Sequence, residues 1–572
     1  MTLQEKINGC RRTRLLAAVV LNLAVLVCML LIIKPAYESN DDLMLASFVD
    51  GQRALMTAHV PYINIVLGGI MKLIYTVLGK SIAWHTIGQY LLIFASFTVL
   101  SYVFLERLRA WQAALISIIL LITIGADMYM IISYTKTASA CTVAGALLIA
   151  DAAEYGAQGS RLTDYVVGII LCAFGFMLRS MEFFACLAIM GAPCLHWLWG
   201  FLFAKQEKSL KSFISYVNPF VIMLIAVAAL WGINHAAWAG EPWRIYRDYD
   251  AVRVAYTDYG KPDYDKLTET YAALGLTESA VKLANDENYY DTERFDSATL
   301  QAISEARKEI LYSPSIGECL GKFLDKCLLD FFVHIPVWGF VLVFMLWLCA
   351  GEHDFRGYIT LAFALGMFSL LYLYLIYRGR YMVDRVDAGL FLALSAVLAY
   401  TLRGEKLENE KGLCAGMLLL GILVSYFMWR PSYRFGSHRE EQPDRAREQQ
   451  IINTLVSDEE HIFLAKTDAI SDNSYAPFET AAPLYREKIV LLGGWNCQHP
   501  LVTDDLAGYG IVNPYKDIIG NEKAYLIDED IDLTLDYIHE YYDSAATAQR
   551  VEELCENTGL NIYRIIAGGG EK

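Results

Sequence analysis

The sequence predicts a polytopic α-helical membrane protein with about 11 transmembrane helices, a helical insertion on the outer face and a small α/β C-terminal domain. Composition is the first observation behind this prediction. The chain has 572 residues, 55% hydrophobic and 19% charged, whereas a soluble protein carries about a quarter charged residues. The second observation is that the apolar residues lie in long blocks. The third is an uneven distribution of charge.

The net charge of −16 is concentrated in two stretches of the chain. Residues 241–309 contain 15 acidic and 9 basic residues, and residues 431–572 contain 26 acidic and 12 basic residues. The remainder is net positive. This pattern indicates a mildly basic membrane body that carries two acidic soluble parts. Because acidic surfaces repel phosphate backbones, we expect no nucleic-acid partner.

The first apolar block, residues 15–33, follows a basic stretch that contains Lys6, Arg11, Arg12 and Arg14. The block is longer than the apolar core of a signal peptide, and no small-residue cleavage site follows it. We therefore interpret it as a first transmembrane helix with a cytoplasmic N-terminus.

Ten further segments are apolar enough to be interpreted as spans. They are residues 84–105, 111–134, 137–151, 162–179, 182–203, 213–234, 325–350, 357–377, 388–402 and 412–429. Residues 60–78 are also apolar, but they contain Pro61, Asn64 and the Gly68-Gly69 pair. Placing that segment in the interface puts the basic stretches 106–109, 205–211 and 403–411 on the cytoplasmic side, as the positive-inside rule favours. The expected topology is a multi-pass protein of the cytoplasmic (inner) membrane with its C-terminal domain outside.

This topology divides the chain into four parts. They are a membrane body (1–234) with a first outer loop (34–83), an outer-face helical insertion (235–324), C-terminal transmembrane helices (325–429) and a soluble outer-face α/β domain (430–572). In the last part, short apolar runs at 461–467, 488–494, 523–528 and 561–566 are typical of strands. Helices are expected around 533–538 and 551–555. Alternation of this kind indicates a small α/β domain. The sequence of this part has no phosphate-binding loop and no Ser-His-Asp or zinc signature, so we interpret it as a binding or positioning domain.

The first outer loop opens with two adjacent carboxylates, Asp41 and Asp42, a few residues beyond the first span. Aspartates at the start of an amphipathic helix can simply cap it. A carboxylate pair at a membrane interface can also hold a divalent metal, Mg²⁺ or Mn²⁺, or deprotonate a hydroxyl group. Both interpretations stay open on the sequence.

Three more ionisable residues lie inside spans or between them, where charge is costly and usually paired or functional. Asp127 lies inside a span, Lys136 lies between two spans, and Arg179 lies three residues before Glu182 between two apolar runs. Pairing of Arg179 with Glu182 and snorkelling of Lys136 to the interface are the structural alternatives.

A cluster of arginines also lies on the predicted outer face. Arg378, Arg380 and Arg385 fall within eight residues, against the positive-inside bias. A phosphate at the membrane surface would hold such a cluster, because guanidinium forks match phosphate oxygens. Neutralisation by Asp384 and Asp387 is the alternative.

The chain resembles the GT-C superfamily of membrane glycosyltransferases, and most of all a bacterial branch related to O-antigen glucosyltransferases and protein mannosyltransferase-like enzymes. The segments that carry the resemblance are "NDD" at 40–42, Tyr134 to Ala138, and "GRYMVDRV" at 379–386. The resemblance also extends to the order of the parts: a first span, an outer loop that opens with an Asp pair, a many-span body and an outer C-terminal domain. The similarity covers most of residues 1–430 and leaves the C-terminal domain unassigned.

The resemblance implies transfer of a sugar from a polyprenyl-phosphate donor to an envelope glycan, lipid or protein acceptor on the outer side of the bilayer. It implies that Asp41 or Asp42 activates the acceptor hydroxyl or binds a metal, with Asp127 as a second acid. Charge on the leaving phosphate would be absorbed by the basic residues Lys136, Arg179, Arg378, Arg380 and Arg385.

Other classes of protein fit the same composition. A membrane transporter or lipid flippase also has many spans and buried charge, although the hydropathy shows no twofold repeat of the kind found in many transporters. An envelope polymer ligase or polymerase would share the polyprenyl carrier, and a scaffold would use the acidic domains to bind a partner. The Asp pair discriminates, because only an enzyme should lose activity when it is altered.

Overall fold

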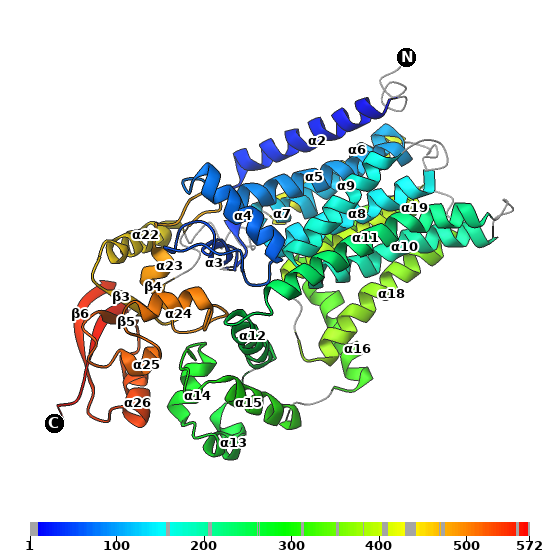
Figure 1. Ribbon diagram of the computed structural model, residues 1–572. Coiled ribbons are helices and arrows are strands. Elements are labelled where there is room, and N and C mark those ends of the chain that lie inside the picture. Colours follow the sequence, from blue (N-terminus) through cyan, green and yellow to red (C-terminus); the bar gives the residue numbers. More distant parts are fainter. Residues whose placement is uncertain are drawn as a thin grey trace.

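The computed structural model describes residues 10–39, 41–155, 161–203, 209–259, 261, 263–310, 314–349, 354–380, 383–402, 410–428, 442–467, 469–470, 475–555 and 560–569. Long helices form an elongated bundle, and a sheet domain and a group of shorter helices lie at one end of it (Figure 1). This end is called the domain end, and the opposite end, where α5 and α8 finish and α9 begins, is called the far end.

Apolar helices make up the bundle, as predicted. Seven are long and apolar enough to cross a membrane: α2 (Arg11–Ile32), α5 (Trp84–Arg107), the continuous run Ala110–Met130, α8 (Tyr134–Tyr155), α10 (Ser180–Phe203), α11 (Leu210–Ala237) and α18 (Phe355–Tyr377). The run comprises α6 (Ala110–Leu120), a π-helical turn η1 (Leu121–Gly125) and α7 (Ala126–Met130). Shorter or more polar helices are α9 (Leu162–Leu178), α17 (Ile335–Cys349), α19 (Asp384–Thr401) and α20 (Glu410–Met428). The chain is therefore a multi-pass membrane protein.

All of the predicted spans fall on these helices, with differences in length that have a physical reason. The two short segments predicted at 137–151 and 388–402 are helices of 22 and 18 residues, α8 and α19. Both lie in the middle of the bundle, where small and hydroxyl side chains pack against other helices and lower the hydropathy. The segment predicted at 325–350 begins with irregular turns, η4 (Lys326–Asp330) and η5 (Phe331–Val333), before α17.

The apolar segment in the first loop forms one short helix, α4 (Ile65–Leu78). The side chain of Asn64 caps it by accepting a hydrogen bond from the Val66 N–H at 3.0 Å. Its 14 residues extend about 21 Å, less than the roughly 30 Å of a bilayer core, so it is too short for a plain span. Gly68 is needed for packing, because a Cβ there would lie 2.1 Å from the Ala58 carbonyl oxygen.

The predicted insertion is helical. It contains α12 (Trp243–Thr257), the turn η3 (Tyr264–Lys266), α13 (Thr268–Ala273), α14 (Glu278–Asn285), α15 (Ser297–Ile310) and α16 (Ile316–Asp325). Buried tyrosines form much of its interior, and they share one apolar core with the C-terminal domain; they are Tyr249, Tyr256, Tyr271, Tyr289 and Tyr290. The insertion and the C-terminal domain therefore pack as one body at the domain end.

The C-terminal part is a five-stranded sheet with helices, as predicted. The strands β3 (Ile462–Ala465), β4 (Ile489–Leu491), β5 (Ala524–Asp528), β6 (Thr547–Cys555) and β7 (Leu560–Ile566) lie in the order β4-β3-β5-β7-β6. β4, β3 and β5 are parallel, whereas β7 and β6 are antiparallel to their neighbours. The helices are α22 (Gln442–Val456), α23 (Tyr485–Lys488), α24 (Pro500–Ala507), α25 (Pro514–Asp517) and α26 (Ile531–Tyr541).

One element of this domain was wrongly predicted. Residues 551–555 are not helical and belong to the edge strand β6. A stretch of five residues is too short to distinguish the periodicity of a helix from that of a strand. Pairing with β7 gives it the strand conformation.

Candidate functional site

A short pairing of strands fixes the first loop to the bundle. β1 (Ala36–Tyr37) pairs in parallel with β2 (Ile131–Ile132), which lies at the break between α7 and α8. The Glu38 N–H also donates to the Ile132 carbonyl oxygen at 3.0 Å. The loop therefore enters the domain end at a defined position beside the start of α8.

Lys136 and Asp127 form a buried ion cluster behind this pairing. The Lys136 Nζ atom lies 2.5 Å from Glu38 Oε2 and 2.7 Å from Asp127 Oδ2, and it donates to the Ile131 carbonyl oxygen at 3.1 Å. Two carboxylates and one carbonyl oxygen therefore surround its ammonium group, and the side chain has no exposed surface. The structure pairs Lys136 with Asp127, and the roles of phosphate ligand and second acid stay predictions.

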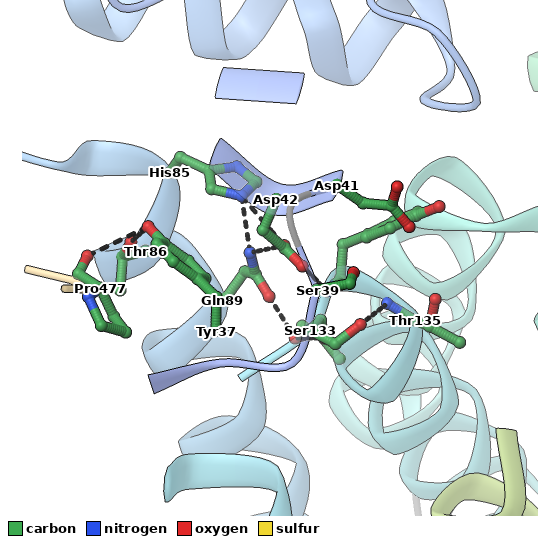
Figure 2. A network of polar contacts seen from close by, with 12 residues as sticks. Tyr37, Ser39, Asp41, Asp42, His85, Thr86, Gln89, Ser133, Thr135 and Pro477 are labelled. Carbon is green, nitrogen blue, oxygen red and sulfur yellow. Dashed lines mark hydrogen bonds and ion pairs between the residues drawn. The ribbon is translucent and has the colours of Figure 1, made fainter. Parts of the chain in front are cut away.

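Asp42 lies in a second buried network, which fixes the start of α3 (Asp41–Ala46) (Figure 2). Gln89 Nε2 donates to Asp42 Oδ1 at 2.7 Å, and His85 Nε2 lies 3.2 Å from the same oxygen. The backbone N–H of Tyr134 donates to this carboxylate at 3.0 Å. Asp42 has no exposed surface and fixes the loop through these contacts, and its role as the acid stays a prediction.

Asp41 points away from this network (Figure 2). Its Oδ2 atom lies 2.9 Å from Arg385 Nη1, which also donates to Ser39 Oγ at 2.8 Å. Its Oδ1 atom accepts a hydrogen bond from the indole N–H of Trp495 at 3.2 Å. The side chain is 16% exposed, so a small group can reach it. Asn40, the first residue of the motif, lies outside the described residues.

Arg385 has a donor that is still available. Its Nε atom is buried and has no hydrogen-bond partner among the residues that the structure describes. Burying an unsatisfied guanidinium donor costs free energy, which a bound anion would recover. Arg385 is therefore a cation in contact with Asp41 that still has one unsatisfied donor among the described residues.

Arg179 approaches the same place from the junction between α9 and α10. It donates a hydrogen bond to the phenol oxygen of Tyr134, and its guanidinium lies 5.2 Å from the centre of that ring. Charges that act on it include those of Glu182 and Asp41. Glu182 is buried and accepts a hydrogen bond from Ser139 Oγ at 3.0 Å. Of these two predicted cations, Arg385 contacts Asp41 directly, whereas Arg179 contacts Tyr134, whose backbone N–H binds Asp42.

Arg378 and Arg380 lie elsewhere, because they occupy the connection between α18 and α19. Arg380 pairs with Asp258 at 2.5 Å, and the guanidinium groups of Arg378 and Arg380 lie 6.0 and 5.9 Å from the centre of the Tyr259 ring. Both partners follow α12 in the insertion. The structure therefore divides the predicted three-arginine cluster, and only Arg385 lies at Asp41.

Sequence reasoning missed Trp495, which the C-terminal domain contributes from the loop after β4. Its carbonyl oxygen accepts a hydrogen bond from the Tyr246 hydroxyl at 2.8 Å, and its ring lies 5.6 Å from that of Tyr62. Nothing in "GGW" at residues 493–495 indicates that this loop meets a carboxylate more than 450 residues away. The contact depends on how two domains pack.

A neutral histidine supports this loop. His499 Nε2 donates to the His59 carbonyl oxygen at 3.1 Å, and its Nδ1 accepts from the Leu501 N–H at 3.3 Å. Burial lowers the pKa of His499 to about 3, which agrees with a ring that carries one proton. The C-terminal domain also contacts the first loop through an ion pair between the buried Arg53 and Asp505.

The expected divalent metal does not find a convergent set of ligands at the Asp pair. Asp41 and Asp42 point apart, and Asp41 faces the guanidinium of Arg385, whose charge repels a cation. Within the described ranges, no group of three or more His, Cys, Asp and Glu side chains is gathered as a metal site. The metal stays a prediction.

Comparisons with known proteins complete the description. The sequence matches no protein-family model and no curated protein. Among solved structures, the chain is similar to ArnT from Cupriavidus metallidurans in the apo state (TM-score 0.40) and bound to undecaprenyl phosphate (TM-score 0.39). Each match covers 96% of this chain and 97% of the other at 11% sequence identity. At these values the similarity assigns neither activity nor substrate to this chain.

Proposed function

We propose that this chain is an integral membrane glycosyltransferase that moves a sugar from a polyprenyl-phosphate carrier to a hydroxyl group of an envelope glycan, lipid or protein. The observation that carries the proposal is the reachable carboxylate of Asp41, paired with Arg385 at one end of an apolar bundle. A base beside a cation is what transfer from a phosphate leaving group needs. Arg179 adds a second cation on Tyr134, whose backbone N–H binds Asp42.

In the proposed reaction, Asp41 takes the proton of the acceptor hydroxyl as its oxygen attacks the anomeric carbon. A bond forms between that oxygen and the sugar, and the bond between the sugar and the phosphate oxygen breaks. The charge left on the polyprenyl phosphate is stabilised by Arg385 through its unsatisfied Nε donor, with Arg179 beside it. Trp495 and Ser39 keep the Asp41–Arg385 pair oriented before the substrates bind.

The proposed orientation places the domain end outside the cytoplasmic membrane and the N-terminus inside. Support comes from the far end, where Arg107, Arg161 and Arg356 gather with Asp151 and Glu154. Basic residues at that end agree with the positive-inside rule. The polyprenyl tail would lie on the apolar surface of the helices, with its phosphate at the level of Arg385.

The proposal predicts that removing the charge of Arg385 harms the use of the donor. We expect Arg385→Gln to lower kcat/KM for the donor about 100-fold, because one charged contact to the leaving phosphate is lost. Arg385→Lys should recover only part of this, since lysine lacks the fork that reaches both Asp41 and a phosphate. Steady-state transfer at varied donor concentration measures the effect, and Arg244→Gln on the exposed side of α12 is the matched control. Equal kinetics for Arg385→Gln and Arg244→Gln would contradict the role.

Trp495 is predicted to be a positioning residue. Trp495→Phe keeps an aromatic ring beside Tyr62 but removes the N–H that orients Asp41. We expect kcat to fall about 10- to 100-fold with KM for both substrates almost unchanged, since a hydrogen bond to a charged group is worth about 1.5–3 kcal/mol. Thermal unfolding measured on the same samples should be nearly that of the native chain. A parallel fall in stability and in activity would indicate a packing role instead.

The test of the proposal is transfer in vesicles that contain the full chain and a labelled polyprenyl-phosphate sugar pool. Covalent transfer of label to an acceptor, lost in Asp41→Asn, supports the glycosyltransferase. Movement of the carrier across the bilayer without covalent transfer would indicate the flippase instead. Transfer of whole polymer chains rather than single sugars would indicate a ligase or polymerase.

A further inference from the structure

A pocket of about 280 Å³ lies beside the Asp41 site and takes no part in the scheme above. Its walls come from the first loop, the start of α10, the end of α11 and the helix α12. The lining includes Tyr62, Trp231, His235, Trp238, Arg247 and Asp250. Two walls are therefore the ends of apolar helices, and the others belong to the first loop and the insertion.

The membrane side of this pocket is continuous with exposed apolar surface. Met181 and Phe184 on α10 and Trp231 and Ile233 on α11 are all more than half exposed. They lie on helices apolar enough to cross a bilayer, so this surface faces lipid in the membrane. The pocket therefore opens at the level where the acyl chains end and the polar head groups begin.

The lining combines aromatic faces with polar groups. The rings of Trp231 and His235 stack at 5.4 Å, and Trp238 and Tyr246 face each other at 6.0 Å. Asp250 and Arg247 add one carboxylate and one guanidinium at the rim. The only contact that the structure gives Arg247 within the described residues is with its neighbour Asp248, at 3.3 Å. A sugar ring matches this lining, because it has apolar faces for the rings and hydroxyl edges for the polar groups.

Tyr62 connects the pocket with Asp41. Its hydroxyl accepts a hydrogen bond from Arg253 Nη2 at 2.7 Å and donates to Asp250 Oδ1 at 3.4 Å. Its ring packs edge-on against Trp495, whose N–H binds Asp41. Tyr62 itself has a positive φ of 62°, a strained conformation for a residue with a side chain. The rings of Tyr62 and Trp495 therefore connect the pocket with the proposed base.

We propose that this pocket binds the sugar head group of a lipid-anchored acceptor, which reaches it from the outer leaflet along the ends of α10 and α11. The inference rests on the proposed function, and it narrows the acceptor from glycan, lipid or protein to a glycolipid. The donor then occupies the side of Asp41 that faces Arg385, and the acceptor occupies the side that faces Tyr62.

The test uses the full chain in lipid nanodiscs and two photoreactive probes with the same diazirine-bearing dodecyl chain. One probe carries a maltose head and the other a phosphocholine head, and labelled peptides are mapped by mass spectrometry. We expect the maltoside to label residues 180–184 and 231–238 about fivefold more than the phosphocholine probe, which corresponds to about 1 kcal/mol. Equal labelling by both probes, or selective labelling elsewhere, would overturn the proposal.

Two pairs of variants sharpen this test. Trp231→Ala and Arg247→Ala remove exposed lining groups, whereas Ile225→Ala and Arg244→Ala remove exposed groups of the same helices that do not line the pocket. The first pair should abolish the preference for maltoside, and the second pair should keep it. Asp41→Asn should also keep it. If the labelling is selective but the native chain transfers no sugar, the pocket stands as a glycolipid site and the transferase proposal fails. If the native chain transfers sugar but the labelling is unselective, the transferase proposal stands and the pocket is not a glycolipid site.

Discussion

Asp41→Asn is expected to lower kcat/KM for sugar transfer about 1,000-fold, or roughly 4 kcal/mol of transition-state stabilisation. The amide keeps an oxygen that can accept from the Trp495 N–H, but it cannot take a proton from an acceptor hydroxyl. The ion pair with Arg385 is lost as well, but Arg385 keeps its hydrogen bond to Ser39 Oγ and can still donate to the amide oxygen. The free energy of unfolding should therefore change by less than about 2 kcal/mol. Transfer kinetics in vesicles and thermal unfolding in detergent measure the two quantities.

The neighbouring carboxylate provides the matched comparison. Asp42→Asn keeps the shape but removes one acceptor from the buried network of Gln89, His85 and the Tyr134 N–H. We expect a loss of stability of about 1–3 kcal/mol and a loss of activity that follows the fraction of folded protein. Activity that survives in Asp41→Asn but disappears in folded Asp42→Asn would reverse the assignment of the base.

Asp41 and Asp42 are adjacent in the sequence but differ in burial, and other features of the fold were also only partly predictable from the sequence. Hydropathy predicted the membrane helices because transfer to lipid depends on composition along the chain. The same reasoning underestimated α8 and α19, which other helices rather than lipid surround, so their serine, threonine and alanine residues are tolerated. β6 escaped prediction because it is an exposed, charged edge strand whose conformation depends on β7.

The candidate site, too, could be predicted from the sequence only in part. An Asp-Asp pair near a membrane is visible in the sequence, but a helix start turns adjacent side chains in different directions, and only packing decides which is buried. Arg385 and Arg378 look equivalent in sequence, yet α19 positions one and the connection before it positions the other. The Trp495 contact has no local signal at all, since it joins residues from opposite ends of the chain.

For Lys136, the sequence predicts a contact with the donor phosphate, whereas the structure places it in a buried ion cluster with Glu38 and Asp127. Replacing it with methionine leaves Glu38 and Asp127 as two buried carboxylates without their cation. Breaking a buried ion pair from one side costs about 3–5 kcal/mol, because the remaining buried charge loses the cation that offset its desolvation. We therefore expect Lys136→Met to lower the free energy of unfolding by about that amount, measured by denaturant titration in detergent. Lys282→Met is the control, since its pair with Glu278 is well exposed and should contribute less than about 0.5 kcal/mol.

The mechanism of this loss can be isolated with a second substitution. Adding Asp127→Asn to Lys136→Met removes one of the two stranded charges, so the double variant should be more stable than Lys136→Met alone. Activity should recover in proportion, because the loop that carries Asp41 is anchored through Glu38 and β1. If Lys136→Met is instead as stable as the native chain but no longer transfers sugar, the lysine acts on the substrate. The role of phosphate ligand that the sequence predicted for it would then be correct, and the ion cluster would describe only the protein without its donor.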